Sequence, residues 1–257
     1  MILRDTNVAF EVFMVKRHQE IDFASGALVF PGGKLDVQDS NPALLATCSE
    51  QNFDLNQLAV RICGIRETFE EAGILLARDN IDGKIIGAAR CSQLVDWYRE
   101  PLHNRDITLL EIVRKENLTL ACDELVLFAH WVTPSYFSRR FDAFFFIAKA
   151  PLEQIASHDK IESVDSVWIT PNAALNDANE GRKTIVFATR MNLQKLTYFQ
   201  STSALIQNSM ESEVYTVEPQ VEENDGDVTF TIPIEAGYGL TKYTECGGPT
   251  LKIKSDK

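Results

Sequence analysis

The segment Leu55–Ala72 constrains the fold of this chain most, because every local signal in it predicts a single amphipathic helix. Its apolar residues recur at alternating spacings of three and four, which gathers them on one stripe of a helix. These residues are Leu55, Leu58, Ile62, Ile65, Phe69 and Ala72. Asp54 and Gln57 have the spacing of a capping box, and Gly73 stands where a left-handed residue ends such a helix. We therefore expect this helix to be a central element of the core.

Strands and further helices are expected on both sides of this helix. Runs of β-branched and aromatic residues predict strands at residues 8–16, 27–30, 125–132, 143–148 and 164–169. Helical patterns occupy residues 91–100, 108–117 and 191–206, and Pro171 opens another helix. Residues 36–51 contain the turn formers of a loop, and residues 211–233 are strand-like around an acidic turn at 222–226. Because strands and helices are mixed from end to end, we expect one α/β (α+β) layered domain spanning residues 1–257.

The charge of the chain narrows the partners that it can bind. Lys and Arg number 25 and Asp and Glu number 37, so the formal net charge is −12. Such a chain is repelled by phosphate backbones, which argues against nucleic acids and anionic membranes as general partners. A small anionic ligand remains compatible with this charge if a metal ion lies between the two.

The five cysteines are widely spaced and form no Cys-x-x-Cys pair, which argues against a disulfide framework or a zinc knuckle. This pattern fits a reducing cytosol. The first 13 residues carry three charged residues among the apolar ones, so they do not resemble a signal peptide. The apolar run at 143–148 is too short to span a bilayer.

The residues that suggest chemistry lie near the end of the predicted helix. Glu67, Glu70 and Glu71 occupy positions i, i+3 and i+4, so their carboxylates share one face. Clustered carboxylates suit a hard divalent cation such as Mg²⁺ or Mn²⁺. Arg66 can hold one of these carboxylates through a charge-assisted hydrogen bond. A bare Glu-x-x-Glu-Glu is more often an ordinary solvated acidic face, so the surrounding sequence has to decide.

The surrounding sequence resembles the signature of the Nudix hydrolase family, G-x5-E-x7-R-E-U-x-E-E-x-G-U, where U is a bulky apolar residue. Residues 66–74 match its second half without a gap, except that Thr68 takes the first U position. Gly33, which follows the strand at 27–30, matches the opening glycine. The resemblance implies a mixed β-sheet sandwiched between helices, with a glycine turn whose backbone carbonyl can approach the metal. Taken alone, the glycines would be a plain turn after a strand.

One departure from the signature stands out. Counted from Gly33, the family spacing would put the arginine at position 47, but Arg66 stands 19 residues later. We place this insertion at about residues 34–53 and expect a loop that leaves Gly33 close to the acidic face of the helix. Counted back from Arg66, the middle Glu of the signature falls on Leu58, so we expect that acid to be missing.

A split signature of this kind resembles the subgroup that includes the animal peroxisomal coenzyme A diphosphatases and their bacterial relatives. Residues 25–33, 139–142 and 237–239 also resemble that subgroup. The implied activity is Mg²⁺- or Mn²⁺-dependent hydrolysis of a diphosphate linkage in a nucleotide derivative, with coenzyme A or an acyl-coenzyme A as the preferred substrate. Two alternatives stay open: another nucleoside diphosphate derivative, such as a dinucleotide or ADP-ribose, and a Nudix-fold binding or regulatory module without catalysis.

The resemblance also assigns roles to individual residues. The expected catalytic residues are Arg66, Glu67, Glu70 and Glu162, and the expected metal ligands are Gly33, Glu67, Glu70 and Glu71. The substrate-binding candidates are Arg17, Arg139 and Arg140, because arginine can hold a phosphate through two hydrogen bonds. An ordinary strand end is the more common interpretation of Arg17, and a surface pair is an equally common interpretation of Arg139 and Arg140. Glu162 is chosen because it lies six residues before Trp168, in a loop ahead of a late strand, although Asp159 or Asp165 could serve instead and a solvated loop Glu is at least as common.

The remaining expectations concern the rest of the molecule. We expect helical additions, a C-terminal extension at about residues 207–257, and a small-molecule substrate, and a homodimer is compatible with these. The chain ends Ser255-Asp256-Lys257 instead of the Ser-Lys-Leu type of signal, so we expect the cytoplasm.

Overall fold

A computed structural model of the protein describes residues 1–18, 24–48, 53–159 and 161–245. The predicted helix is α2, Leu55–Ala72, and both hydrogen bonds of its capping box join Asp54 and Gln57. Gly73 ends the helix in the left-handed conformation, with φ of 68°. The structure thus confirms this element at both ends.

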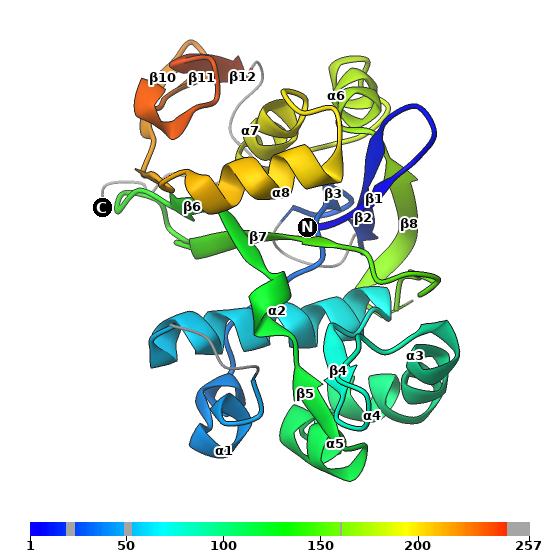
Figure 1. Ribbon diagram of the computed structural model, residues 1–257. Helices are drawn as coiled ribbons and strands as arrows, with labels where there is room; N and C mark the ends of the chain where they lie inside the picture. The colour runs from blue at the N-terminus through cyan, green and yellow to red at the C-terminus, as the bar shows by residue number, and fades with distance from the viewer. Residues whose placement is uncertain (19–23, 49–52, 160, 246–257) are drawn as a thin grey trace.

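A mixed sheet lies in the middle of the molecule (Figure 1). Its strands are β1 (Ile2–Asp5), β2 (Phe10–Arg17), β3 (Leu28–Val29), β6 (Val126–Val132), β7 (Asp142–Lys149), β8 (Ser163–Ile169) and β9 (Thr216–Val217). The order is β3-β2-β1-β7-β6-β9, and β8 pairs with β2. The β1–β7 and β6–β9 pairs are parallel, while the other pairs are antiparallel. The expected mixed sheet is confirmed.

Helices cover both faces of this sheet (Figure 1). On one side lie α2, α1 (Pro42–Leu45), α3 (Ala88–Leu94), α4 (Glu100–His103), α5 (Leu109–Lys115) and the small sheet of β4 (Ala77–Asp79) and β5 (Leu118–Leu120). On the other side lie α6 (Pro171–Asn179), α7 (Phe187–Leu196) and α8 (Thr202–Glu211). A three-stranded sheet of β10 (Gln220–Asn224), β11 (Asp227–Thr231) and β12 (Lys242–Glu245) completes the described fold.

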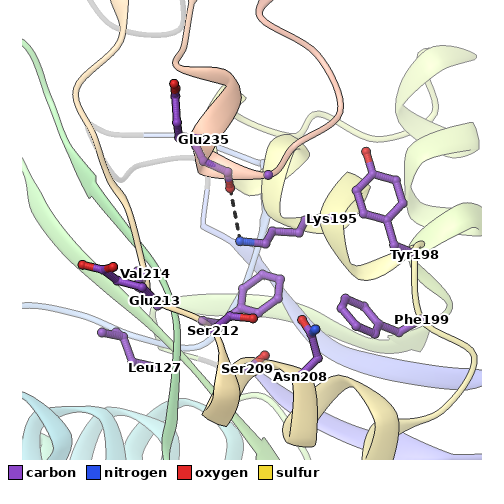
Figure 2. A pocket seen from close by; sticks show the side chains of 13 residues that line it. Leu127, Lys195, Tyr198, Phe199, Asn208, Ser209, Ser212, Glu213, Val214 and Glu235 are labelled. Carbon is purple, nitrogen blue, oxygen red and sulfur yellow. Dashed lines mark hydrogen bonds between the residues drawn. The ribbon is translucent and has the colours of Figure 1, made fainter.

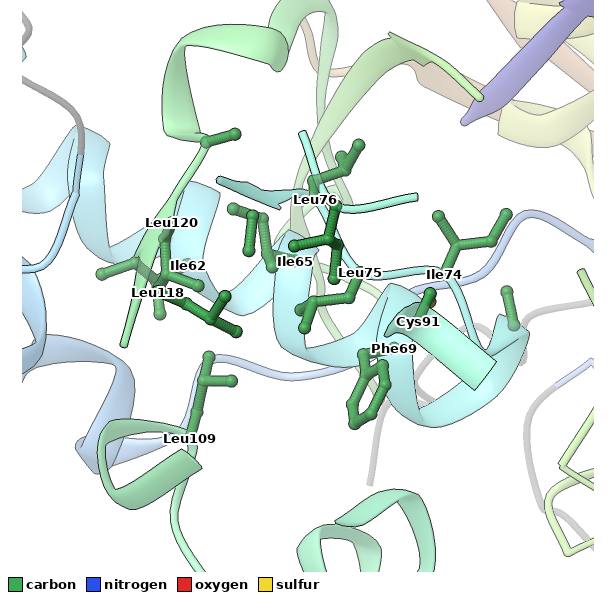
Figure 3. Packing of buried hydrophobic residues seen from close by; sticks show 14 of the residues in the cluster. Ile62, Ile65, Phe69, Ile74, Leu75, Leu76, Cys91, Leu109, Leu118 and Leu120 are labelled. Carbon is green, nitrogen blue, oxygen red and sulfur yellow. The ribbon is translucent and has the colours of Figure 1, made fainter. Parts of the chain in front are cut away.

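Alternation along β2 divides the core between these two sides. Phe13 and Val15 belong to the apolar cluster around α2, whereas Val12 and Met14 belong to the cluster around α6–α8. Figure 3 shows the α2 side, where Ile62, Ile65 and Phe69 of the predicted stripe pack with residues that follow the helix. These stripe residues have no exposed surface, so α2 is held rigidly against its neighbours.

Several predicted boundaries were wrong for local reasons. The stretch at 36–51, expected as a loop, contains a 3₁₀ turn (Val37–Ser40) and α1, because Asp36 and Asn41 cap them and Pro42 opens α1. Residues 49–51 of that stretch lie outside the described residues. The helix expected at 191–206 is two helices, α7 and α8, since Ser201 caps a new start.

Other predictions missed an element or its length. The helix expected at 91–100 is part of a longer helical stretch that continues from α3 through a π-helical turn (Val95–Arg99) into α4. The stretch at 211–233 begins with the last residue of α8, but the strands expected there are confirmed as β9 and the hairpin of β10 and β11, which turns at 225–226 within the acidic segment. The short strands β1, β4, β5 and β12 were not expected, because runs of three or four residues carry little periodicity.

The described part of the expected C-terminal extension packs onto the α6–α8 side. Tyr238 is 1% exposed, and its hydroxyl donates to the Asn192 side chain and accepts from the Trp131 indole. Residues 246–257 lie outside the described residues. Among the helices that the structure describes, none is both long and apolar enough to cross a membrane.

The shortness of β1 determines where the chain that follows β3 leaves the sheet. β1 pairs with the first half of β2, and β3 takes the neighbouring place along the second half, opposite Val15 and Lys16. The chain that leaves β3 therefore emerges within the sheet instead of at its edge, and the ring of Phe30 lies 6.3 Å from that of Phe145 in β7.

Candidate active site

The turn after β3 meets the acidic end of α2. The backbone N–H of Gly32 donates to Oε2 of Glu71 at 2.9 Å. A Cβ atom added to Gly33 would lie 2.5 Å from the carboxyl atoms of Glu67, so a side chain there would displace that carboxylate. The prediction that the insertion leaves Gly33 close to the acidic face is confirmed.

Glu67 and Glu71 are both withdrawn from water. Glu71 is 5% exposed, and the side chain of Glu67 is 13% exposed. Burial raises the pKa of Glu67 to about 7, helped by the charges of Glu70 and Glu162 and opposed by Arg66. Burial also raises the pKa of Glu71 to about 8, although its hydrogen bond from Gly32 opposes the shift. Two buried carboxylates that repel each other form a site that a cation would stabilise.

Arg66 is held by an acid that the sequence analysis overlooked. Its Nε and Nη2 donate to the two carboxylate oxygens of Asp39, at 2.8 and 2.9 Å, and Asp39 is fully buried. Asp39 is the sixth residue after Gly33, which is the place of the middle acid when the signature is counted forward. The expectation that this acid is missing is therefore wrong: counting back from Arg66 to Leu58 crossed the insertion.

Arg66 also contacts the helix carboxylates, as predicted. Its Nη1 lies 2.8 Å from Oε1 of Glu67 and 3.4 Å from Oε2 of Glu70. Burial alone would lower the pKa of Arg66, but the hydrogen bonds from Arg66 to Asp39 and the charge of Glu67 raise it above its ordinary value. Arg66 therefore stays charged and joins the start of the insertion to α2.

The end of α2 is tied to the loop that carries Glu162. Arg99 donates from Nε to the Glu70 carbonyl at 2.8 Å and from Nη2 to the Ser157 carbonyl at 2.7 Å. The backbone N–H of His18 donates to the Glu162 carbonyl at 2.8 Å, which fixes the other end of this loop beside β2.

The side chain of Glu162 is exposed, and its charge raises the pKa of both Glu67 and Glu71. The Asp159 carboxylate instead accepts hydrogen bonds from backbone N–H groups of the loop, including that of Glu162, and so shapes it. Asp165 accepts from the N–H of Ser166. The catalytic role of Glu162 stays a prediction.

The three predicted substrate-binding arginines lie in different surroundings. The charge of Arg17 acts on Glu71, and among the described residues its buried Nε meets no hydrogen-bond acceptor. Arg139 lies over the ring of Phe141, and Arg140 donates to the Thr133 carbonyl. Both of these side chains are exposed in the connection between β6 and β7, and their contacts there are local. The structure brings Arg17, and not the other two, into electrostatic contact with the acidic residues.

The donor set fits a hard divalent cation. Carboxylate oxygens of Glu67 and Glu71 lie beside the Gly32–Gly33 backbone, and these are the ligand types that Mg²⁺ and Mn²⁺ prefer. In the described residues no group of three or more His, Cys, Asp and Glu side chains is already gathered as a metal centre. The Glu67 and Glu70 carboxylates are turned to Arg66 instead, so metal binding would have to compete with that contact.

A cavity of about 270 Å³ lies elsewhere, on the α7–α8 side of the sheet. Figure 2 shows Lys195 among the residues that line it. The Lys195 ammonium donates to the carbonyl of Ala236 at 3.2 Å. Burial lowers the pKa of Lys195. None of the predicted site residues lines this cavity, so it is separate from the acidic cluster.

Comparisons with known proteins agree on the family. Residues 46–189 match the family model described as the NUDT19 Nudix domain. The acyl-coenzyme A diphosphatase NUDT19 of Xenopus laevis is 28% identical, over 65% of this chain and 54% of that protein. A relative from Caenorhabditis elegans is 26% identical, over 66% of this chain and 50% of its own length.

The chain thus spans about half the length of the curated relatives that it matches. The crystal structure of a Nudix hydrolase from Alicyclobacillus acidocaldarius superposes with a TM-score of 0.64 and 22% identity, and covers 80% of this chain and 92% of that one. That similarity supports the fold, and the family model covers more than half of the chain. The chain belongs to the Nudix hydrolase family.

Proposed function

We propose that this protein hydrolyses a diphosphate linkage in a nucleotide derivative with the help of Mg²⁺ or Mn²⁺. The observation that carries the proposal is the pair of buried carboxylates, Glu67 and Glu71, against the Gly32–Gly33 turn. Burying two carboxylates without a cation costs free energy of folding. Such a pair is therefore more typical of a metal-binding site than of a contact that stabilises the fold.

We assign the following roles in this reaction to the residues of the site. Glu67, Glu71 and the Gly33 backbone would hold the metal, with Glu70 as a further candidate. The bound metal would neutralise the diphosphate, polarise phosphorus and lower the pKa of a coordinated water. Glu162 would accept the proton of the attacking water, because it is the exposed carboxylate whose charge reaches the acidic cluster. Arg66 would orient Glu67, since it is itself fixed by Asp39.

Arg17 is the best supported of the three substrate-binding candidates. A buried guanidinium nitrogen without an acceptor costs free energy, and a phosphate oxygen would supply the missing partner. Arg139 and Arg140 stay in the proposal as exposed groups that can reach a longer substrate at its far end.

Within this reaction, coenzyme A or an acyl-coenzyme A is the substrate that we propose first. The support is the family match and the name of the Xenopus relative. A dinucleotide or ADP-ribose is the alternative substrate, and a binding module without catalysis is the alternative function. We further propose that residues 1–257 form one domain.

A hydrolysis screen tests these proposals. The purified protein is incubated with coenzyme A, an acyl-coenzyme A, a dinucleotide, ADP-ribose and a nucleoside triphosphate, with Mg²⁺, with Mn²⁺ or with a chelator. Products are identified by mass, and the Glu67→Gln variant serves as the control for contaminating activity. Metal-dependent cleavage of coenzyme A supports the full proposal, and cleavage of another diphosphate supports the reaction but not the substrate. Substrate binding without any cleavage would favour the binding module.

A further inference from the structure

Two cysteines that are far apart in sequence meet beside the insertion. The thiol of Cys122 donates a hydrogen bond to Sγ of Cys48, and the two sulfur atoms are 3.0 Å apart. Cys48 lies at the end of the turn after α1, within the insertion, and Cys122 lies in a 3₁₀ turn after β5. A disulfide bond needs a sulfur–sulfur distance of about 2 Å, so closure requires a movement of about 1 Å.

The backbone holds this pair in place. The N–H of Leu120 donates to the Thr47 carbonyl at 2.8 Å, and Cys48 forms a parallel bridge with Leu120. Cys122 is fully buried and Cys48 is half-buried, so one thiol of the pair is open to a reagent and the other is protected. This is the arrangement of an attacking cysteine and a resolving cysteine.

The hydrogen bond within this pair favours a thiolate at Cys48 over one at Cys122. The hydrogen bond from Cys122 lowers the pKa of Cys48. The same hydrogen bond, together with burial, raises the pKa of Cys122, although the positive charge of Arg61 opposes the shift. Cys48 is therefore the thiol of the pair that more readily gives the thiolate, which is the reactive form of sulfur.

We propose that Cys48 and Cys122 form a reversible dithiol–disulfide site that reacts with low-molecular-weight disulfides. The Cys48 thiolate attacks one sulfur of the disulfide reagent, which forms a mixed disulfide and releases one thiolate of the reagent. Cys122, after losing its proton to solvent, then attacks Sγ of Cys48 and expels the second thiolate. The two protein thiols are oxidised to one disulfide, and the reagent is reduced to two thiols.

The expected consequence is a covalent tie between the insertion and the 3₁₀ turn that follows β5. Asp39, which holds Arg66, lies in the same insertion, so the tie would restrain a segment that supports the candidate active site. The proposal itself does not depend on the hydrolase activity, because thiol chemistry can be followed without any substrate.

The test follows the five thiols during oxidation. Fully reduced protein is mixed with oxidised glutathione, samples are quenched by alkylation, and digested peptides are identified by mass. We expect a linked peptide containing Cys48 and Cys122 before any other cysteine reacts, and at least about tenfold faster in the folded protein than in urea, because the fold pre-positions the thiols. Dithiothreitol should reverse it.

Matched variants separate this pair from the other thiols. Cys63→Ser, Cys91→Ser and Cys246→Ser should each still form the link. Cys122→Ser should stop at a glutathione adduct on Cys48, and Cys122→Ala provides a second version if that variant does not fold, as judged by circular dichroism. A folded wild-type protein that accumulates the Cys48 adduct without the link, links other cysteines first, or does not react would overturn the proposal.

Discussion

The buried pair of Asp39 and Arg66 gives the sharpest test of how the site is held together. Asp39→Asn keeps the size of the side chain, but it removes a negative charge and turns one hydrogen-bond acceptor into a donor that faces Arg66. The two bonds to Arg66 that it disturbs are 2.8 and 2.9 Å long, and Oδ2 of Asp39 also accepts from the Asp36 backbone N–H at 2.8 Å. The Asp39 side chain is 1% exposed, while that of Arg66 is 12% exposed. The contact is therefore almost free of solvent screening.

The expected loss of stability depends on the partners that Arg66 retains in the Asp39→Asn variant. Removing one partner of a buried ion pair costs about 3–5 kcal/mol when the other charge is left alone. Arg66 is not left alone, because Glu67 lies 2.8 Å from Nη1 and the Lys34 carbonyl accepts from Nη2 at 3.0 Å. We therefore expect a loss of about 2–3 kcal/mol in the free energy of unfolding, just below that range.

Asp36→Asn is the matched control, because it makes the same chemical change in the same 3₁₀ turn. Asp36 caps that turn, which Asn does equally well, and its ion pair is with Arg105, whose side chain is 84% exposed. Such a surface pair is worth about 0–1 kcal/mol, so the control should stay close to the wild type. Urea titrations of both variants without metal measure the difference, and equal midpoints with equal slopes would refute the role given to Asp39.

The other predictions concern the acidic cluster and its surroundings. Glu67→Gln and Glu71→Gln should each remove most turnover at saturating Mg²⁺. The urea midpoint without metal should be unchanged or higher, because each substitution removes one of two buried like charges. Near-normal rates in both variants would contradict the metal assignment. Gly33→Ala should raise the Mg²⁺ concentration needed for the half-maximal rate, because the added methyl group would meet Glu67. Gly87→Ala is the control and should leave this concentration unchanged, because Gly87 has open space around it. Equal Mg²⁺ curves for the two variants would contradict the close approach of Gly33 to Glu67. Glu162→Gln should lower the maximal rate at saturating metal, and a rate that Mn²⁺ restores would make it a metal ligand instead of a base.

The parts of the fold that the sequence predicts well are those with long, repeated signals. In α2 the apolar stripe, the capping box and the terminal glycine all agree, and the structure has the helix at the predicted residues. Each end of the strands β6, β7 and β8 lies within one residue of its predicted position. Their apolar and aromatic residues are enough in number to mark a buried strand.

The features that the sequence did not predict depend on contacts between residues that are far apart in sequence. Asp39 was assigned to a loop because its own neighbours are turn formers, yet its partner Arg66 is 27 residues away. Likewise, β1 is recognised only by its pairing with β2 and β7, since four residues with two charges carry no strand pattern. The contact of Cys48 with Cys122, which are 74 residues apart, is invisible to spacing rules for the same reason.

The split signature shows which of the family's spacings are physically required. Gly33 must approach Glu67, and Asp39 must reach Arg66; both contacts are present although extra residues separate Asp39 from α2. Closing a longer loop is cheap, at about 0.6 kcal/mol for each doubling of its length. Asp54 caps α2 by itself, so the helix does not rely on the preceding loop to begin at the right residue. An insertion between Asp39 and Asp54 is therefore tolerated, whereas even one residue added between Gly33 and Asp39 would move the buried carboxylate away from Arg66.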